Sequence, residues 1–428
     1  MKKFSASEDY LARAERTIPL GSQTFSKSRT QFPFGVSPYF VTHGRGSRVW
    51  DVDGNEYIDF VNGLAAITLG YNDEEVNEAV RRQLELGVIF SLPHPLEAEV
   101  AELICDMVPC AEMVRFGKNG SDATSGAIRL ARAHTNRDRV AVCGYHGWQD
   151  WYIGSTSRNR GVPQATRDLT HTFAYNEPEP LRELLERHQG EFAAVILEPM
   201  NAIEPKPGFL ERVKELAHAH GALLVFDETI TGFRYSNAGA QGFFGVTPDL
   251  ATFGKGLANG FPISAVAGPR QLMRLMEEIF FSFTFGGETL SLAAAKATLL
   301  KLRREPVTQR IAAKGSRCRG AIDDQIRSYG LTETFSVSGH PSWLFFNIRD
   351  SHGRSSLEIK TLYLQEMFAQ GILTIGTFNL SDAHTDEDID ALVAAHDRFL
   401  RIVADALRSG TLDGVLRCAP LQPLFKVR

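Results

Sequence analysis

From about residue 73 onward, short apolar segments alternate with longer amphipathic segments that have the period of helices. Such an alternation predicts an α/β fold, in which a mostly parallel sheet is covered by helices. The apolar segments are continuous rather than interrupted by polar residues, which is typical of strands buried on both faces of a sheet. The predicted strands have the sequences MVRFGK, RVAVCG, AAVILEP, ALLVFDE and PISAVAG.

The two ends of the chain have different patterns. Residues 49–60, VWDVDGNEYIDF, place an Asp-Gly-Asn turn between two alternating runs, which predicts a β-hairpin. From about residue 305 the pattern predicts a long helix, two strands around residues 334–348 and two further helices. We therefore expect three parts: an N-terminal segment with a β-ribbon (1–60), a large sheet domain (61–305) and a small C-terminal α+β domain (306–428).

Composition argues against several classes of function. The 428 residues carry a net charge of -5, which offers no basic surface for nucleic acid or an anionic membrane. The five cysteines form no Cys-x-x-Cys pair, and His218 and His220 lack the i, i+4 spacing of a helical zinc site. No apolar segment approaches the ~20 residues that span a bilayer, and no export signal is visible. We expect a cytoplasmic protein that binds no metal, nucleic acid or membrane.

The residues best suited to chemistry follow two of the short apolar strands. Asp227 ends the strand LLVFD, and open parallel sheets bind ligands at the carboxyl ends of their strands. Taken alone, Asp227 could equally cap the next turn. Lys255 follows another short strand between two glycines, a setting from which a structural surface lysine would gain nothing. Together they are the minimum set for pyridoxal phosphate (PLP), since the lysine can form a Schiff base and the carboxylate can keep the pyridine nitrogen protonated.

Two further segments suit the same cofactor. Residues 116–133, FGKNGSDATSGAIRLARA, predict a strand, a glycine turn and a helix that begins near Ser121. Helix N-termini bind phosphate, so we assign Gly120 and Ser121 to the cofactor phosphate; the alternative is an ordinary helix with Ser121 as its N-cap. The segment CGYHGW offers the ring of Tyr145 for stacking on the pyridine, and the alternative is a core tyrosine.

In order and spacing, the motifs GYHGW, ILEPM, VFDETITGFR, PDLATFGKGLANGFPISA, TFGG and AHTDEDID resemble the class III aminotransferases of PLP fold type I. Within that class they resemble the branch of glutamate-1-semialdehyde aminomutase, over nearly the whole chain. The resemblance implies that Lys255 is the Schiff-base lysine and general base, and that Asp227 is the partner of the ring nitrogen. It also implies that Glu198 lies near the cofactor and that Thr284 reaches the phosphate of a neighbouring subunit, and hence a homodimer with shared sites.

The chain departs from the family pattern at several positions. Asn119 and Asp122 stand where the family commonly has Ser and Glu, and Thr229 replaces a Val that packs under the cofactor ring in many members. The aminomutase has an Arg for the substrate carboxylate at about the position of Lys27, and a longer loop before the AHT motif that helps to retain its intermediate. An aminotransferase must release a product between its half-reactions, so these last two differences favour an aminotransferase.

We therefore expect transfer of an amino group from a donor such as glutamate, through the pyridoxamine phosphate form of the cofactor, to an aldehyde or ketone acceptor. The acceptor that we expect is an oxidised sugar or aminocyclitol of a biosynthetic pathway, because aromatic side chains crowd one motif: Tyr145, Trp148, Trp151 and Tyr152. Three alternatives stay open. They are glutamate-1-semialdehyde 2,1-aminomutase, a racemase or decarboxylase on the same scaffold, and a non-catalytic binding protein, for which loss of the lysine would be expected.

Overall fold

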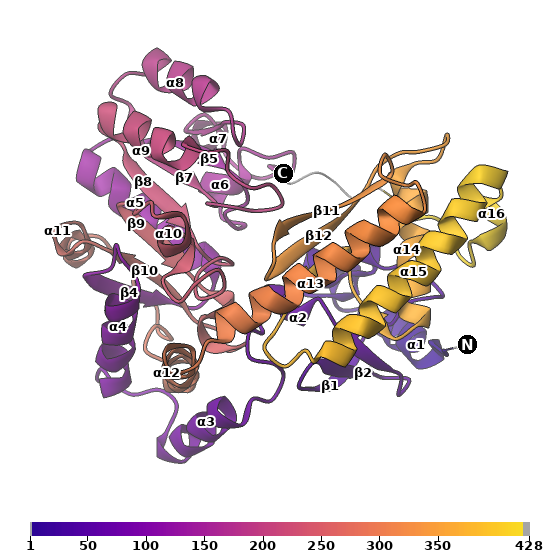
Figure 1. Cartoon of the computed structure of the whole chain (residues 1–428). Coiled ribbons are helices and arrows are strands. Elements are labelled where there is room, and N and C mark those ends of the chain that lie inside the picture. The colour runs from indigo at the N-terminus through magenta and orange to yellow at the C-terminus, as the bar shows by residue number, and fades with distance from the viewer. Residues whose placement is uncertain (1, 423–428) are drawn as a thin grey trace. The chain divides into compact units, whose positions relative to one another are not determined.

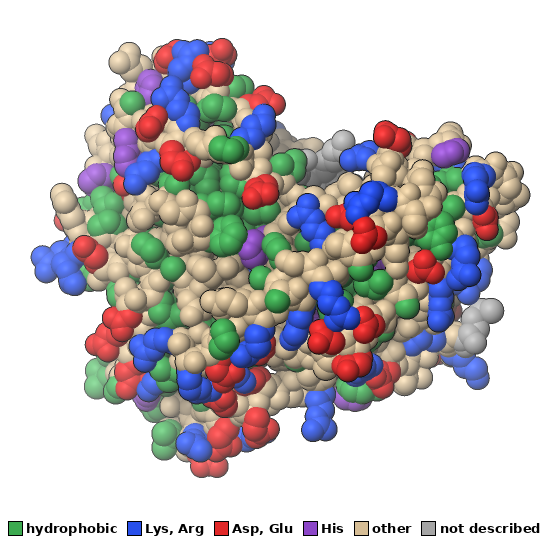
Figure 2. Space-filling model, in the orientation of Figure 1, with side chains coloured by type: hydrophobic (Ala, Val, Ile, Leu, Met, Phe, Trp, Pro, Cys, Tyr) green, Lys and Arg blue, Asp and Glu red, His purple; other side chains and the backbone are tan. Residues whose placement is uncertain are grey.

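The computed structural model describes residues 2–422 and contains two compact units. Of the described residues, unit 1 contains 2–73 and 309–422, and unit 2 contains Glu74–Thr308. The division of the chain at residues 60 and 305 stays a prediction. No helix within residues 2–422 is both long enough and apolar enough to cross a membrane. On the face that Figure 2 shows, acidic and basic side chains are interspersed.

Unit 2 is built around one seven-stranded sheet (Figure 1). In spatial order its strands are β4 (Met113–Gly117), β10 (Ser264–Gly268), β9 (Leu250–Phe253), β8 (Leu223–Asp227), β7 (Phe192–Leu197), β5 (Arg139–Cys143) and β6 (Thr170–Thr172). The strands from β9 to β6 pair in parallel, and β10 pairs antiparallel with both β9 and β4. The predicted α/β fold with a mostly parallel sheet is therefore confirmed.

Helices cover both faces of this sheet, which explains why the strands are apolar throughout. In β7, Ala194 and Ile196 pack into the core on the side of α5, whereas Val195 and Leu197 pack on the side of α8 and α9. The longer helices of unit 2 are α3 (Glu74–Leu86), α4 (Pro95–Met107), α5 (Gly120–Thr135), α8 (Pro178–Arg187), α9 (Phe209–Ala219) and α12 (Thr289–Arg304). The short ones are α6 (Asp150–Ile153), α7 (Gln164–Arg167), α10 (Gly239–Phe244), α11 (Arg270–Met273), η4 (Lys255–Ala258) and η5 (Arg274–Glu277).

Unit 1 contains two small sheets. The first has the order β1 (Val41–Arg45), β2 (Arg48–Asp51), β3 (Glu56–Asp59) and β13 (Ile372–Leu373), and the second has the order β11 (Phe335–His340), β12 (Trp343–Ile348) and β14 (Thr377–Asn379). The antiparallel β2–β3 pair confirms the predicted hairpin. The parallel β3–β13 pair ties the N-terminal part of the chain to the C-terminal part.

The helices of unit 1 include the three that the C-terminal pattern predicts. These are α13 (Val307–Ser328), α14 (Ser356–Ala369) and α15 (Asp386–Ser409). The AHT motif has a structural function here, because Thr385 caps α15 by a reciprocal pair of hydrogen bonds with Asp388. The shorter helices are α1 (Ser5–Ala14), α2 (Asn62–Ala65), α16 (Leu412–Val415), η1 (Pro19–Gly21), η2 (Phe25–Lys27) and η3 (Arg29–Gln31).

A glycine within α13 generates a prediction about stability. A Cβ at Gly315 would collide with the carbonyl oxygen of Pro341, whereas a Cβ at Gly320 on the same helix would meet open space. We predict that Gly315→Ala lowers the free energy of unfolding by about 1–3 kcal/mol through overpacking. The matched control Gly320→Ala should raise it by about 0.5–1 kcal/mol, because alanine favours the helix. Urea unfolding followed by circular dichroism measures both, and a Gly315→Ala protein of unchanged stability would contradict the packing described.

Candidate active site

Five strand ends meet at one edge of the unit 2 sheet. Strands β5, β7, β8 and β9 are parallel, and β4 runs in the same direction because β10 is antiparallel to both of its neighbours. Ligands of open α/β sheets bind at this edge. The predicted residues found there are Gly120 and Ser121 after β4, Tyr145 after β5, Glu198 after β7, Asp227 at the end of β8 and Lys255 after β9.

Asp227 is a buried carboxylate with several hydrogen-bond donors. It is 5% exposed, and its Oδ2 lies 2.8 Å from Nδ1 of His146. Its Oδ1 accepts hydrogen bonds from the hydroxyl groups of Thr229 at 2.6 Å and Thr252 at 3.1 Å. Burial alone would raise the pKa of Asp227, but the hydrogen bonds from His146 and Thr229 outweigh it and hold the pKa below its ordinary value. The carboxylate is therefore ionised at neutral pH.

Asp227 also has the turn-capping function that the sequence left open, because its Oδ1 accepts the backbone N–H of Thr229 at 3.1 Å. The cap uses one acceptor position of one oxygen. It does not account for the donors that come from other strands. Both interpretations of this residue are therefore compatible with the structure.

His146 contacts the buried Asp227 carboxylate, a pairing that the sequence did not predict. It is 2% exposed, and its Nε2 lies 3.2 Å from the carbonyl oxygen of Cys143 while its Nδ1 faces Asp227. Each ring nitrogen thus faces an oxygen that can accept a hydrogen bond from the imidazole. In the sequence, His146 stands next to Tyr145 in the GYHGW motif, and nothing in its spacing shows that it reaches across β7 to the end of β8.

The predicted phosphate turn is the start of α5, and its N-cap is Asn119 rather than Ser121. The Asn119 side chain accepts the N–H of Asp122, and the Asp122 carboxylate accepts the N–H of Asn119. The two departures from the family pattern thus form a capping box. Gly120 and Ser121 stand in the first turn, where N–H groups have no acceptor within the helix and are available for a phosphate.

Close contacts between loops bring this turn to the other site segments. Gly147 has φ +105°, and a Cβ there would collide with Oγ of Ser121. The same hydroxyl accepts the N–H of Trp148 at 3.3 Å. On the opposite side, the Cα of Gly120 lies 3.9 Å from the position that a Cβ on Gly254 would take. The start of α5 therefore lies between the aromatic loop that follows β5 and the lysine loop that follows β9.

Lys255 begins η4 directly after β9. Its φ is +43°, in the left-handed region that residues with a side chain rarely adopt. Backbone strain of this kind is found most often at functional sites, where the surrounding structure imposes it. Among the lysines within residues 2–422, Lys255 is the one with a positive φ, and its side chain is half-buried.

Tyr145 and Glu198 are joined to each other. The backbone N–H of Tyr145 donates to Oε2 of Glu198 at 2.9 Å, and the same oxygen accepts from Nδ2 of Asn201 at 3.0 Å. The Tyr145 ring packs edge-on against Tyr152 and is 39% exposed, so part of it is accessible for stacking. Trp151 and Tyr152 belong to the hydrophobic core, so they give no support to a sugar-like acceptor.

Thr284 lies apart from this group. It is exposed in the turn that precedes α12, and none of the interactions described for residues 2–422 joins it to the other predicted site residues. The site within one chain therefore contains six of the seven predicted residues. All seven roles toward a cofactor stay predictions. Within residues 2–422, no group of three or more His, Cys, Asp or Glu side chains is arranged to hold a metal ion.

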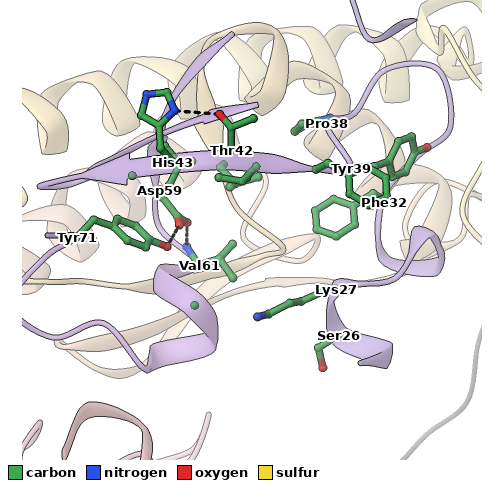
Figure 3. Close-up of a pocket in the computed structure, with 16 residues that line it drawn as sticks. Ser26, Lys27, Phe32, Pro38, Tyr39, Thr42, His43, Asp59, Val61 and Tyr71 are labelled. Atoms are coloured by element: carbon green, nitrogen blue, oxygen red, sulfur yellow. Dashed lines mark hydrogen bonds between the residues drawn. The ribbon is translucent and has the colours of Figure 1, made fainter. Parts of the chain in front are cut away.

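Lys27 lies in unit 1, at a cavity of about 360 Å³ (Figure 3). The buried carboxylate of Asp59 also lines this cavity, where it accepts from the hydroxyl of Tyr71 and the N–H of Val61. Burial raises the pKa of Asp59, and the Lys27 charge is among the groups that oppose this shift. Most other lining side chains are apolar or aromatic, including Phe32, Pro38, Tyr39, Val49 and Leu373.

Val61 and Gly63 line this cavity, and Gly63 belongs to a turn with a left-handed backbone. Residues 62–65 all have φ between +46° and +67°. Consecutive left-handed residues are costly unless they are glycine, and here only Gly63 is. Strain of this kind is imposed by the surrounding structure and is common next to ligand sites.

The sequence matches a known protein family and several of its members. The family described as "Aminotransferase class-III" matches residues 32–348. The 3-aminobutyryl-CoA aminotransferase of Cloacimonas acidaminovorans (strain Evry) is 34% identical over an alignment of 403 residues, and the match covers 92% of this chain and 96% of that protein. The glutamate-1-semialdehyde 2,1-aminomutase 2 of Brevibacillus brevis is 34% identical over an alignment of 418 residues, and the match covers 91% of this chain and 96% of that protein.

Solved structures agree as well. The FumI protein of Sphingopyxis sp. MTA144, in its PLP internal aldimine form, is 30% identical and has a TM-score of 0.88 to this chain, with 95% of this chain and 98% of that chain covered. Its fold is therefore the fold seen here. The match to the family and the two relatives extend over most of the sequence. The chain belongs to the class III aminotransferases.

Proposed function

We propose that the protein uses the edge of the unit 2 sheet to bind PLP and to move an amino group from a donor such as glutamate to an aldehyde or ketone. The observation that carries the proposal is the Asp227 carboxylate, buried and kept ionised at the edge where the Lys255 loop meets the start of α5. Buried ionised groups with tuned pKa values are most common at functional sites.

The residues present suit PLP. When bound, PLP supplies an aldehyde to which amines attach and a pyridine ring that withdraws electrons from the carbon bearing the amino group. The N–H groups of Gly120 and Ser121 would hold its phosphate, Tyr145 would cover one face of its ring, and Asp227 would accept a hydrogen bond from its ring nitrogen. The Nζ of Lys255 would hold the aldehyde carbon until the substrate arrives and would then carry a proton to and from the substrate carbon.

Overall identity does not distinguish an aminotransferase from an aminomutase, because the relatives of both kinds are 34% identical to this chain. Two features of the sequence favour an aminotransferase. Lys27 stands where the aminomutase has an Arg, and an ammonium group cannot make the bidentate pair that a guanidinium makes with a carboxylate. Residues 371–382 form two short strands and a turn in place of the longer retaining loop. An oxidised sugar or aminocyclitol acceptor and a cytoplasmic location stay predictions.

The reaction can be tested by supplying glutamate alone to the PLP-loaded protein. We expect about one equivalent of 2-oxoglutarate per site and then no more until a carbonyl acceptor is added, because the amino group stays on the enzyme. Failure of every amine donor to give its carbonyl product would contradict the proposal. Rapid conversion of glutamate-1-semialdehyde to 5-aminolevulinate without any acceptor would replace it by the aminomutase.

The assignment of Lys255 is tested in the same assay. We expect Lys255→Ala to slow the release of 2-oxoglutarate by roughly 10²–10⁴-fold, the usual contribution of a general acid-base group. A suitable control is Lys296→Ala, since the ammonium group of Lys296 in α12 pairs with Glu99 of α4 at 2.9 Å. A Lys255→Ala protein as fast as this control would refute the assignment.

We also propose a homodimer in which Thr284 serves the partner's site. Exposed apolar side chains surround Thr284, and a second exposed apolar segment, residues 84–92, lies close by, since the N–H of Thr289 donates to the carbonyl oxygen of Val88 at 3.0 Å. Clusters of exposed apolar side chains are common at protein–protein interfaces. The side chains beside Thr284 are Phe280, which is 81% exposed, Phe283 and Phe285.

Mixed dimers test this arrangement. Thr284→Ala should weaken PLP binding by about tenfold, the effect of one lost hydrogen bond to a charged group. When Thr284→Ala and Lys255→Ala subunits are mixed, the Thr284→Ala subunit keeps its lysine and receives an intact threonine from its partner, so each mixed dimer should regain one normal site. No recovery of PLP affinity on mixing, or a monomer by light scattering, would contradict the shared site.

A further inference from the structure

Thr229 touches three of the segments that form the candidate active site. It stands two residues after the end of β8 and is half-buried. Its Cγ2 methyl lies 2.9 Å from the position of a Cβ on Gly120 and 3.3 Å from that of a Cβ on Gly254, so it packs against the start of α5 and against the lysine loop. Its hydroxyl oxygen lies 2.6 Å from Oδ1 of Asp227.

The two oxygens of the Asp227 carboxylate are used unequally. Oδ1 accepts three hydrogen bonds, from the N–H and the hydroxyl of Thr229 and from the hydroxyl of Thr252. Oδ2 accepts one, from the ring of His146. A carboxylate offers about four lone-pair positions, two on each oxygen. Oδ1 is therefore saturated, and Oδ2 has one position left.

We infer that Thr229 is a positioning residue, whose hydroxyl makes the shortest of the three hydrogen bonds to Oδ1 and fixes the carboxylate plane so that Oδ2 receives the N–H of the cofactor's ring nitrogen. The inference rests on the proposed role of Asp227 as the partner of that nitrogen. The Val that many members of the family have at this position resembles Thr in shape but has no hydroxyl. The departure noted in the sequence thus adds a contact to Asp227.

The Thr229 hydroxyl also influences the position of the proton between the cofactor's ring nitrogen and Oδ2 of Asp227. Each hydrogen bond donated to a carboxylate stabilises its charged form and makes it a weaker base. A short contact to a charged oxygen, such as that of Thr229, is among the stronger ones. Thr229 therefore shifts the proton from Asp227 toward the ring nitrogen, where it increases the electron-withdrawing power of the ring.

The test is the ¹⁵N NMR chemical shift of the ring nitrogen in holoenzyme loaded with PLP labelled at that atom. In Thr229→Val we expect the signal to move from the protonated position toward that of an unprotonated pyridine, because Asp227 becomes a stronger base. Thr229→Ser, which restores the hydroxyl, should keep the wild-type shift. The matched control is Thr231→Val, which removes a buried hydroxyl that donates to Glu228 at 3.0 Å on the same loop.

The possible results distinguish the role of Thr229 from the role of Asp227. An unchanged shift in Thr229→Val, or an equal change in Thr231→Val, would overturn the positioning role of Thr229. If Thr229→Val alone loses PLP while the other two variants hold it, the hydroxyl is required for binding and the role is supported. A wild-type signal at the unprotonated position would instead refute the role of Asp227 itself.

Discussion

The candidate active site depends on the burial of one charge. An ionised carboxylate inside a protein is costly unless hydrogen bonds and an opposite charge replace the water it has lost. Asp227 meets this requirement with donors from three strand ends: the ring of His146, the hydroxyl and N–H of Thr229, and the hydroxyl of Thr252. Loss of the His146 contact would take from Oδ2 the one hydrogen bond described for it, and the three donors to Oδ1 must converge on a single oxygen, so the geometry of these segments is constrained together.

The same strand ends position the other residues of the site. Thr252 pairs with Asp227 in the register of β8 and β9, only three residues before Lys255. Tyr145 precedes His146, and its N–H is held by Glu198 at the end of the intervening strand. Parallel pairing of β9, β8, β7 and β5 is what places these strand ends next to one another. A sheet with another strand order would separate them.

Much of this could be predicted from the sequence, because continuous apolar strands and the residues that directly follow them carry strong local signals. The strands that end near Gly117, Cys143, Leu197 and Asp227 were predicted on that basis. Strands β13 and β14 are too short to show a period. The pairing of His146 with Asp227 could not be predicted, because it depends on the order of the strands in the sheet. The capping of α5 by Asn119 could not be predicted either, because several neighbouring polar residues could cap the helix. Trp151 and Tyr152 were used to argue for a sugar-like acceptor because they stand near a motif, but in the structure they belong to the hydrophobic core.

The most direct test of this account is a crystal structure of the protein with PLP bound. The account predicts that the ring nitrogen lies about 2.7–3.2 Å from Oδ2 of Asp227 and that the phosphate accepts the N–H groups of Gly120 and Ser121. It also predicts that Nζ of Lys255 is bonded to the cofactor's aldehyde carbon. A ring nitrogen that faces any other group, or a phosphate bound away from the start of α5, would contradict it.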